Sequence, residues 1–273
     1  MGGLMNKMTY FRLIWKNHRS FAIFSMVFIT LLQFLILFLI TTFDMPAILQ
    51  TFLAQMPAKM KVYLSENFFS TLTLDGAAAF GFNHPLVLTL LAMNALNIPT
   101  LHISREMESG SLELLLAHPL RRQSLILKLW ISGCLILLAI ILAAVTGSLT
   151  AVTIYHQLTS EIFINLLKIG LNLWLLFVLI LSYTLMITVF ARTGSRAGNY
   201  AAILTLVFYL LFFLSQLWDD IKFTTYFNIF SYYEPQKLMF GKSNFTLNCV
   251  VLASLIIICF FVSRRQFIRR DIP

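Results

Sequence analysis

The stretch WISGCLILLAIILAAVTGSLTA, residues Trp130–Ala151, decides the fold class of this chain. It has no charged side chain, and it is longer than the about 20 residues that an α-helix needs to cross the hydrocarbon core of a bilayer. Over the whole chain, 59% of the residues are hydrophobic and 11% are charged, whereas soluble domains carry about 25% charged residues. Such a chain cannot cover a globule with polar surface, so we predict an integral membrane protein.

Five further apolar stretches have a similar length and composition. Together the six stretches predict transmembrane helices at residues 21–40, 80–101, 130–151, 169–190, 200–217 and 245–262, none of which contains Asp, Glu, Lys or Arg. A transmembrane β-barrel would show shorter segments of alternating polarity instead. We therefore expect an all-α membrane protein that forms a single domain over residues 1–273.

The positions of the basic residues predict the orientation. If the N-terminus is cytoplasmic, 14 of the 20 Lys and Arg residues lie on the cytoplasmic side, as is typical of multi-span membrane proteins. We therefore expect both termini in the cytoplasm. The same rule accounts for the net charge of +9, so we predict no binding of nucleic acid.

Two segments next to the predicted spans have the composition of interfacial helices. The first, residues 1–20, has apolar side chains at helical spacing: Leu4, Met8, Phe11 and Trp15. This stripe predicts an amphipathic helix on the cytoplasmic surface. The second, residues 218–242, is rich in aromatic side chains, which favour the membrane interface. We expect one or two short helices there, in the outer leaflet.

Small residues recur at every fourth position in two places. They are Ala139, Ala143, Gly147 and Ala151 in the third span, and Gly194, Gly198 and Ala202 near the fifth. Faces of this kind let two membrane helices approach closely. The partner helix belongs either to a second copy or to the same chain, and the pattern leaves both readings open.

Neutral polar residues inside the spans have two readings. Those that could line a transport pathway are Gln33, Asn94, Asn97 and Gln216. The alternative is hydrogen bonding between helices, which is equally consistent with their positions. The five histidines are scattered and lack metal-site spacing, and no phosphate-binding loop motif occurs. We expect no catalytic residues, no metal site and no cofactor bound by this chain.

The stretch SREMESGSLELLLAHPLRRQ, residues Ser104–Gln123, connects the second and third spans. Gly110 is expected to end the incoming helix, and Ser111 can cap a short new one whose first turn suits Glu113. Pro119 disfavours continuation of that helix beyond His118.

The predicted short helix has an apolar side formed by Leu112, Leu115 and Leu116. Glu106 and Glu108 precede it, and anionic lipid headgroups would repel these carboxylates. A groove on a protein partner is therefore favoured over the alternative, a helix that lies on lipid.

This connection closely resembles the segment between the second and third spans of type-2 ABC-transporter permeases. The matching residues are Arg105, Glu106, Glu108, Ser109, Gly110, Leu112, Glu113, Leu114, Leu115, Leu116, Pro119 and Arg122. Residues 191–204, ARTGSRAGNYAAIL, look like the segment that enters the family's fifth span. Residues 232–241, YYEPQKLMFG, are similar to the segment before its last span, although Glu234 departs from the usual small or amide residue.

The resemblance implies a permease of the cytoplasmic (inner) membrane that exports a substrate. It implies a second permease copy, as a homodimer, and two separate ATPase subunits that bind ATP and Mg²⁺. The first, second and fifth spans would line the pathway. The ATPase-coupling residues would be Glu106, Glu108, Gly110, Ser111, Leu112, Glu113, Leu115, Leu116, Pro119, Arg121 and Arg122. The alternatives are a channel or ion-coupled carrier that works without an ATPase, and a structural scaffold.

Overall fold

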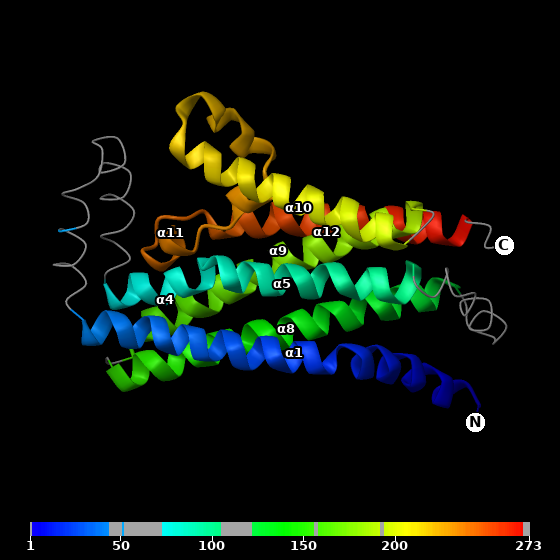
Figure 1. Ribbon diagram of the computed structural model, residues 1–273, viewed down its shortest axis with the longest axis horizontal. Coiled ribbons are helices and arrows are strands. Elements are labelled where there is room, and N and C mark those ends of the chain that lie inside the picture. The colour runs from blue at the N-terminus through cyan, green and yellow to red at the C-terminus, as the bar shows by residue number, and fades with distance from the viewer. Residues whose placement is uncertain are drawn as a thin grey trace.

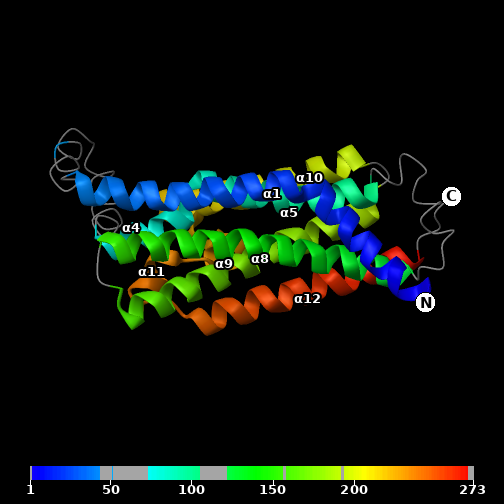
Figure 2. The ribbon, with the colours of Figure 1, turned by 90° about the horizontal axis from the view of Figure 1, so that it is seen from below.

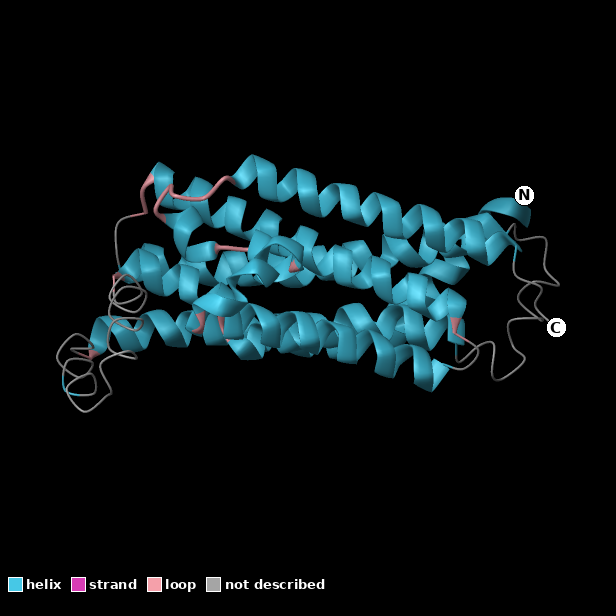
Figure 3. Ribbon diagram, turned by 90° about the horizontal axis from the view of Figure 1, so that it is seen from above, coloured by secondary structure: helices cyan, strands magenta, loops and turns pink. Residues whose placement is uncertain are grey.

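The computed structural model describes residues 2–43, 51, 73–104, 122–155, 158–191 and 194–269. All regular elements in these ranges are helices, and six helical spans are long and apolar enough to cross a membrane. The spans lie side by side along the long axis of the molecule (Figures 1 and 2), and Figure 3 shows no strand among the described residues. The predicted all-α membrane fold with six spans is confirmed.

The helices that form the spans are α1 (Gly2–Thr42), the pair α4 (Leu74–Asn83) and α5 (Pro85–Pro99), α8 (Arg122–Tyr155), α9 (Ser160–Phe190), α10 (Gly194–Leu217) and α12 (Phe245–Arg269). The shorter elements are the π-helical turn η1 (Thr100–Ser104), the 3₁₀ helices η2 (Asp219–Phe227) and η3 (Ile229–Tyr232), and α11 (Pro235–Met239). The first helix begins and the last one ends at the same end of the bundle (Figure 1). We call this the terminal end, and the opposite one the far end.

The helix α9 forms the centre of the bundle. Its most apolar window is 72% buried, whereas those of α1, α10 and α12 are 22%, 17% and 17% buried. Leu173, Leu176 and Phe177 on α9 have no exposed surface. The outer helices instead present large apolar side chains on their free faces, which a lipid environment accommodates without cost.

The small-residue face of the third span packs within the chain. Thr30 on α1 donates a hydrogen bond to the carbonyl oxygen of Ala143 on α8, at 3.0 Å. A Cβ added to Gly147 would lie 3.0 Å from the backbone oxygen of Thr30. For these residues, packing inside one chain is therefore the correct reading, because the α1 backbone occupies the space over the face.

The second span begins before the predicted residues 80–101 and is broken near its start. The helix α4 ends at Asn83 and α5 begins at Pro85, with His84 between them. Proline lacks an amide hydrogen and fits the first turn of a helix. The Nδ1 atom of His84 accepts a hydrogen bond from the backbone N–H of Leu86 and caps the new helix.

The N-terminal segment does not form a helix of its own. Residues 2–42 form the single helix α1, so the predicted boundary between an interfacial helix over 1–20 and a span from 21 is absent. Figure 2 shows the N-terminal part of α1 turned away from the direction of the rest. Phe11 and Trp15 are exposed. Their interfacial location stays a prediction.

Three short helices follow α10 in the segment between the fifth and sixth spans, where the sequence predicted one or two. The helix η2 projects from the bundle at the end of α10 (Figure 1). Its Phe223, Tyr226 and Phe227 side chains are exposed. The predicted placement of these helices in the outer leaflet stays a prediction.

Candidate functional site

The predicted coupling residues lie almost entirely outside the described residues. The structure describes the two borders of the segment: Ser104 is the last residue of η1, and Arg122 is the first of α8. Both borders lie at the terminal end of the bundle (Figure 1). The coupling role therefore stays a prediction. The described part of the site consists of the helices that flank this segment.

The element next to the coupling segment is the π-helical turn η1. Pro99 precedes it and removes one backbone donor from the helical ladder, which gives a local cause for the wider turn. The hydroxyl of Thr100 donates to the carbonyl oxygen of Leu96 at 2.9 Å. His102 and Ile103 are buried. Single π-turns inside helices are frequent at functional sites.

A pair of histidines joins η1 to α1. The ring centroids of His18 and His102 lie 5.1 Å apart, with an angle of 56° between the ring planes. Both side chains are almost completely buried, with 3% and 1% of their surface exposed. The sequence places these residues 84 positions apart and gives no spacing signal for the contact.

A close contact also joins η1 to α10. A Cβ on Gly198 would lie 3.5 Å from Cγ2 of Thr100 and 4.0 Å from its Cβ. Ala197 and Ala201 on the same helix have no exposed surface. The small residues that enter the fifth span therefore pack within the chain at Gly198, while Ala202 is exposed.

A cavity of about 220 Å³ lies between α5 and α10, with η3 at one end. Its lining consists of Pro85, Leu88, Thr89, Ala92, Met93, Leu96, Ala202, Thr205, Leu206, Tyr209 and Phe230. No charged residue lines it. The hydroxyl of Thr205 donates to the carbonyl of Ala201 and shares a second hydrogen bond with Tyr183 of α9, so this polar group is already satisfied by protein.

The predicted pathway residues lie in different surroundings. Asn94 donates hydrogen bonds to Oγ of Ser25 on α1 at 3.0 Å and to the carbonyl of Leu90 at 2.8 Å. This contact is an interhelical hydrogen bond, the alternative that its position left open. Asn97 is half-buried, and Gln216 is exposed at the far end of α10. Gln33 is completely buried against Gly81. A pathway role for these four residues stays a prediction.

Three buried side chains hold the segment after α10 to the far end of the bundle. Asn228 donates to the carbonyl of Phe208 at 2.7 Å, Tyr233 to that of Phe82 at 3.1 Å, and Asn165 to that of Met239 at 3.0 Å. Burial raises the pKa of Tyr233 well above its ordinary value, so its hydroxyl remains a donor. The segment is therefore fixed to α4, α9 and α10.

The segment that resembles the family's region before the last span has a specific turn. Gly241 has φ of +67°, and the N–H groups of Gly241 and Lys242 bond to the carbonyls of Leu238 and Lys237 at 3.1 and 2.7 Å. This is a Schellman termination of α11, which requires a left-handed residue. The structure thus explains the glycine in this position.

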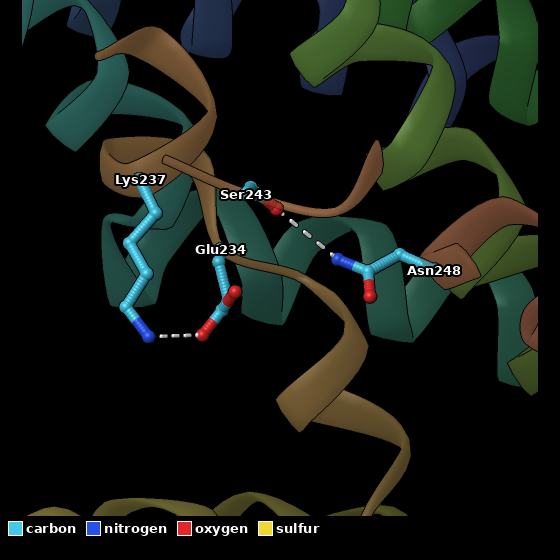
Figure 4. A network of polar contacts seen from close by, with 4 residues as sticks. All are labelled: Glu234, Lys237, Ser243 and Asn248. Carbon is cyan, nitrogen blue, oxygen red and sulfur yellow. Dashed lines mark hydrogen bonds and ion pairs between the residues drawn. The ribbon is translucent and has the colours of Figure 1, made fainter. Parts of the chain in front are cut away.

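Figure 4 shows two polar contacts around this turn. Glu234, the residue that departs from the family pattern, forms an ion pair with Lys237 at 2.6 Å. Asn248 donates to Oγ of Ser243 at 3.3 Å. An exposed ion pair contributes about 0–1 kcal/mol, so the substitution by glutamate is accommodated locally without creating a buried charge.

Among the described residues, no group of three or more His, Cys, Asp or Glu side chains is placed to hold a metal ion. Sequence reasoning missed the histidine pair, and it missed the contacts of Trp130 with Ser182 and of Trp174 with the carbonyl of Cys134. None of these contacts has a local pattern, because their partners come from distant segments.

Comparison with protein families matches residues 13–271 to the model described as ABC-2 family transporter protein. No curated protein matches the chain. The family match includes all six spans, η1 and the segment that resembles the coupling region. Since the match extends over almost the whole sequence, this multi-pass membrane protein belongs to the ABC-2 family of transporter proteins and is a membrane permease of an ABC transporter.

Proposed function

We propose that this permease exports a substrate with energy from a separate ATPase subunit that binds residues 104–123. The observation that carries the proposal is the stretch REMESGSLELLLAHPLRR, which resembles the family's coupling segment. The borders of this stretch, η1 and the start of α8, lie together at the terminal end of the bundle. A partner bound at this end would contact the start of α8 and the end of the second span.

The spans contain few side chains that could bind or relay an ion. The six apolar stretches lack Asp, Glu, Lys and Arg, and ionisable residues at membrane depth are the usual relay of proton-coupled transport. An external ATPase supplies energy without such groups, because its movement enters through the polar connection. This contrast supports the ATP-driven permease over the ion-coupled carrier.

The cavity between α5 and α10 is the best candidate for one wall of the pathway. The second and fifth spans contribute most of its lining, and Ala202, Met93 and Leu206 at its edge are exposed. A second copy of the permease facing this side would close the pathway. We therefore propose that the permease is a homodimer. Gly198 gives no support for a dimer contact, because this residue packs against Thr100 of the same chain.

The test is to purify the tagged permease from membranes of its source cells under mild detergent. We expect an ATPase with a phosphate-binding loop to co-purify and to hydrolyse ATP in a vanadate-sensitive manner. If the permease purifies without an ATPase and conducts ions or substrate in vesicles without ATP, the channel or carrier reading replaces this proposal.

A further inference from the structure

We propose that η1 is the joint through which movement of the coupling segment reaches α1 and α10. In this account Thr100 and His102 are positioning residues, with Gly198 and His18 as their contacts on the two moving helices. The inference rests on the proposed function, since it requires an ATPase that moves residues 104–123.

The position of η1 in the chain meets the first requirement of a joint. It follows α5 without interruption and ends at Ser104, the first residue of the coupling segment. Along the chain, any displacement of that segment acts directly on η1 at one border and on α8 at the other. Ile103 has no exposed surface and His102 has 1%, so η1 is packed against its neighbours, and these must respond when it moves.

The contact with α10 is close enough to transmit such a displacement. Thr100 lies opposite Gly198, at a distance where even a Cβ would be in van der Waals contact. The flanking Ala197 and Ala201 are fully buried, so the terminal end of α10 is held closely. Within one chain the apolar window of α10 is otherwise only 17% buried, so few contacts inside the chain resist a shift of the whole helix.

The contact with α1 is less extensive than that with α10, and it centres on one pair of side chains. The rings of His18 and His102 meet at 5.1 Å between centroids, in a buried site. The apolar window of α1 is 22% buried. In contrast, α9 also contacts η1, but it is 72% buried and serves as the fixed core. Because buried cores resist small displacements, movement of η1 is directed to the less embedded helices α1 and α10.

The arrangement has a consequence for the pathway. The helices α5 and α10 form the cavity described above, and η1 connects to both of them at their terminal ends. A shift of η1 therefore changes the relative position of the two cavity walls. The far end of α10 carries η2, so the backbone of η2 should report this shift from a distance.

A reversible disulfide between η1 and α10 tests the inference. The positions of Thr100 and Gly198 are suited to it, because Cβ of Thr100 and a Cβ on Gly198 would be 4.0 Å apart, within the about 3.5–4.5 Å range of disulfides. Thr100→Cys and Gly198→Cys are introduced together after Cys134, Cys249 and Cys259 are replaced by alanine. The complete transporter, with its ATPase, is then oxidised or reduced.

The measurement is hydrogen exchange of η2 and of α10 beyond Phe208, with and without ATP and vanadate. These amides lie more than about 15 Å along the helix from Gly198, so local rigidity at the disulfide does not reach them. We expect ATP and vanadate to change their exchange in the reduced protein. In the oxidised protein the ATPase remains bound and hydrolyses ATP, but the change is lost, and dithiothreitol restores it.

Three results would overturn the inference: an oxidised protein that keeps the nucleotide-dependent change, a parent without that change, or two cysteines that do not form the disulfide. The single variants Thr100→Cys and Gly198→Cys, oxidised in parallel, should behave as the cysteine-free parent. ATPase binding by the cysteine-free parent distinguishes failure of the proposed function from failure of the joint alone. A parent that binds no ATPase refutes the proposed function and the joint together. If the parent binds an ATPase but the oxidised Thr100→Cys/Gly198→Cys protein keeps the nucleotide-dependent change, the joint alone is refuted.

Discussion

The amide of Gln33 on α1 occupies the space directly over Gly81 on α4, so that any Cβ on Gly81 would overlap with Oε1. Gln33 has no exposed surface, and neither of its amide atoms has a hydrogen-bond partner among the described residues. Close approach of a glycine backbone to a polar oxygen is compatible with a weak Cα–H···O contact. The pair therefore sets how closely α1 approaches the first half of the broken span.

Gly81→Ala should destabilise the protein by about 1–3 kcal/mol, because the new methyl group displaces Gln33 in a packed site. The better helix propensity of alanine offsets at most about 1 kcal/mol of this loss. Reversible unfolding in mixed micelles measures the change. The double variant Gln33→Ala/Gly81→Ala should recover part of it, since truncation of the glutamine creates room.

Gly198→Ala is the matched control for this substitution, because its Cβ would lie at an ordinary contact distance of 3.5 Å from Thr100. We expect no loss of stability beyond about 0.5 kcal/mol, the range of substitutions without steric conflict. An equal loss in Gly81→Ala and Gly198→Ala would contradict the assignment of Gln33 as the cause.

Gly147→Leu should separate α1 from α8. Here the obstacle is the Thr30 backbone, with its oxygen 3.0 Å from the position of a Cβ, and a backbone cannot rotate away as a side chain can. Overpacking of this kind costs about 1–3 kcal/mol or more. The comparison is Leu142→Ala on the exposed face of α8, which should leave thermal unfolding unchanged. Equal melting temperatures for both variants would refute close α1–α8 packing.

Much of the fold follows from the sequence, because a membrane span needs only length and a lack of charge. The same criterion cannot place the break at His84, since Pro85 in an apolar run is compatible with both a kink and a new helix. It also gives no sign that residues 1–20 continue into the first span as one helix, because a helix that changes from polar to apolar surroundings shows no break in its periodicity. The His18–His102 contact depends on the tertiary arrangement and has no local signal.

The orientation is tested by labelling of single cysteines in sealed cells, in a background without native cysteines. Lys242→Cys, in the turn before α12, should react with a membrane-impermeant maleimide. Arg265→Cys, on the exposed side of α12 near the terminal end, should react only after the cells are opened. Labelling of Arg265→Cys in intact cells would reverse the predicted orientation.

The homodimer is tested at the edge of the cavity. Ala202→Cys lies on the exposed side of α10, and a short bifunctional maleimide should link two copies there in native membranes. The control is Val250→Cys on α12, which is also exposed but does not line the cavity. Equal crosslinking at both positions, or none at Ala202→Cys, would contradict a dimer that closes the pathway on this side.

The central claim is that residues 104–123 bind and couple an ATPase through the apolar side formed by Leu112, Leu115 and Leu116. Each fully buried leucine contributes about 1.5–3 kcal/mol, whereas an exposed rim charge such as that of Glu108 contributes about 0–1 kcal/mol per pair. Glu108→Gln should therefore have little effect. Leu114→Asp is the matched control, because residues two positions apart do not share a helix face with Leu112 or Leu116.

The most direct measurement is the amount of ATPase that co-purifies with Leu115→Asp and with Leu116→Asp, together with the vanadate-sensitive hydrolysis of each complex. We predict that both variants insert into the membrane at the wild-type level and lose the ATPase or its coupled hydrolysis, while Leu114→Asp keeps both. Wild-type binding and coupled hydrolysis in Leu115→Asp and Leu116→Asp would contradict the account, because the segment would then not be the coupling element.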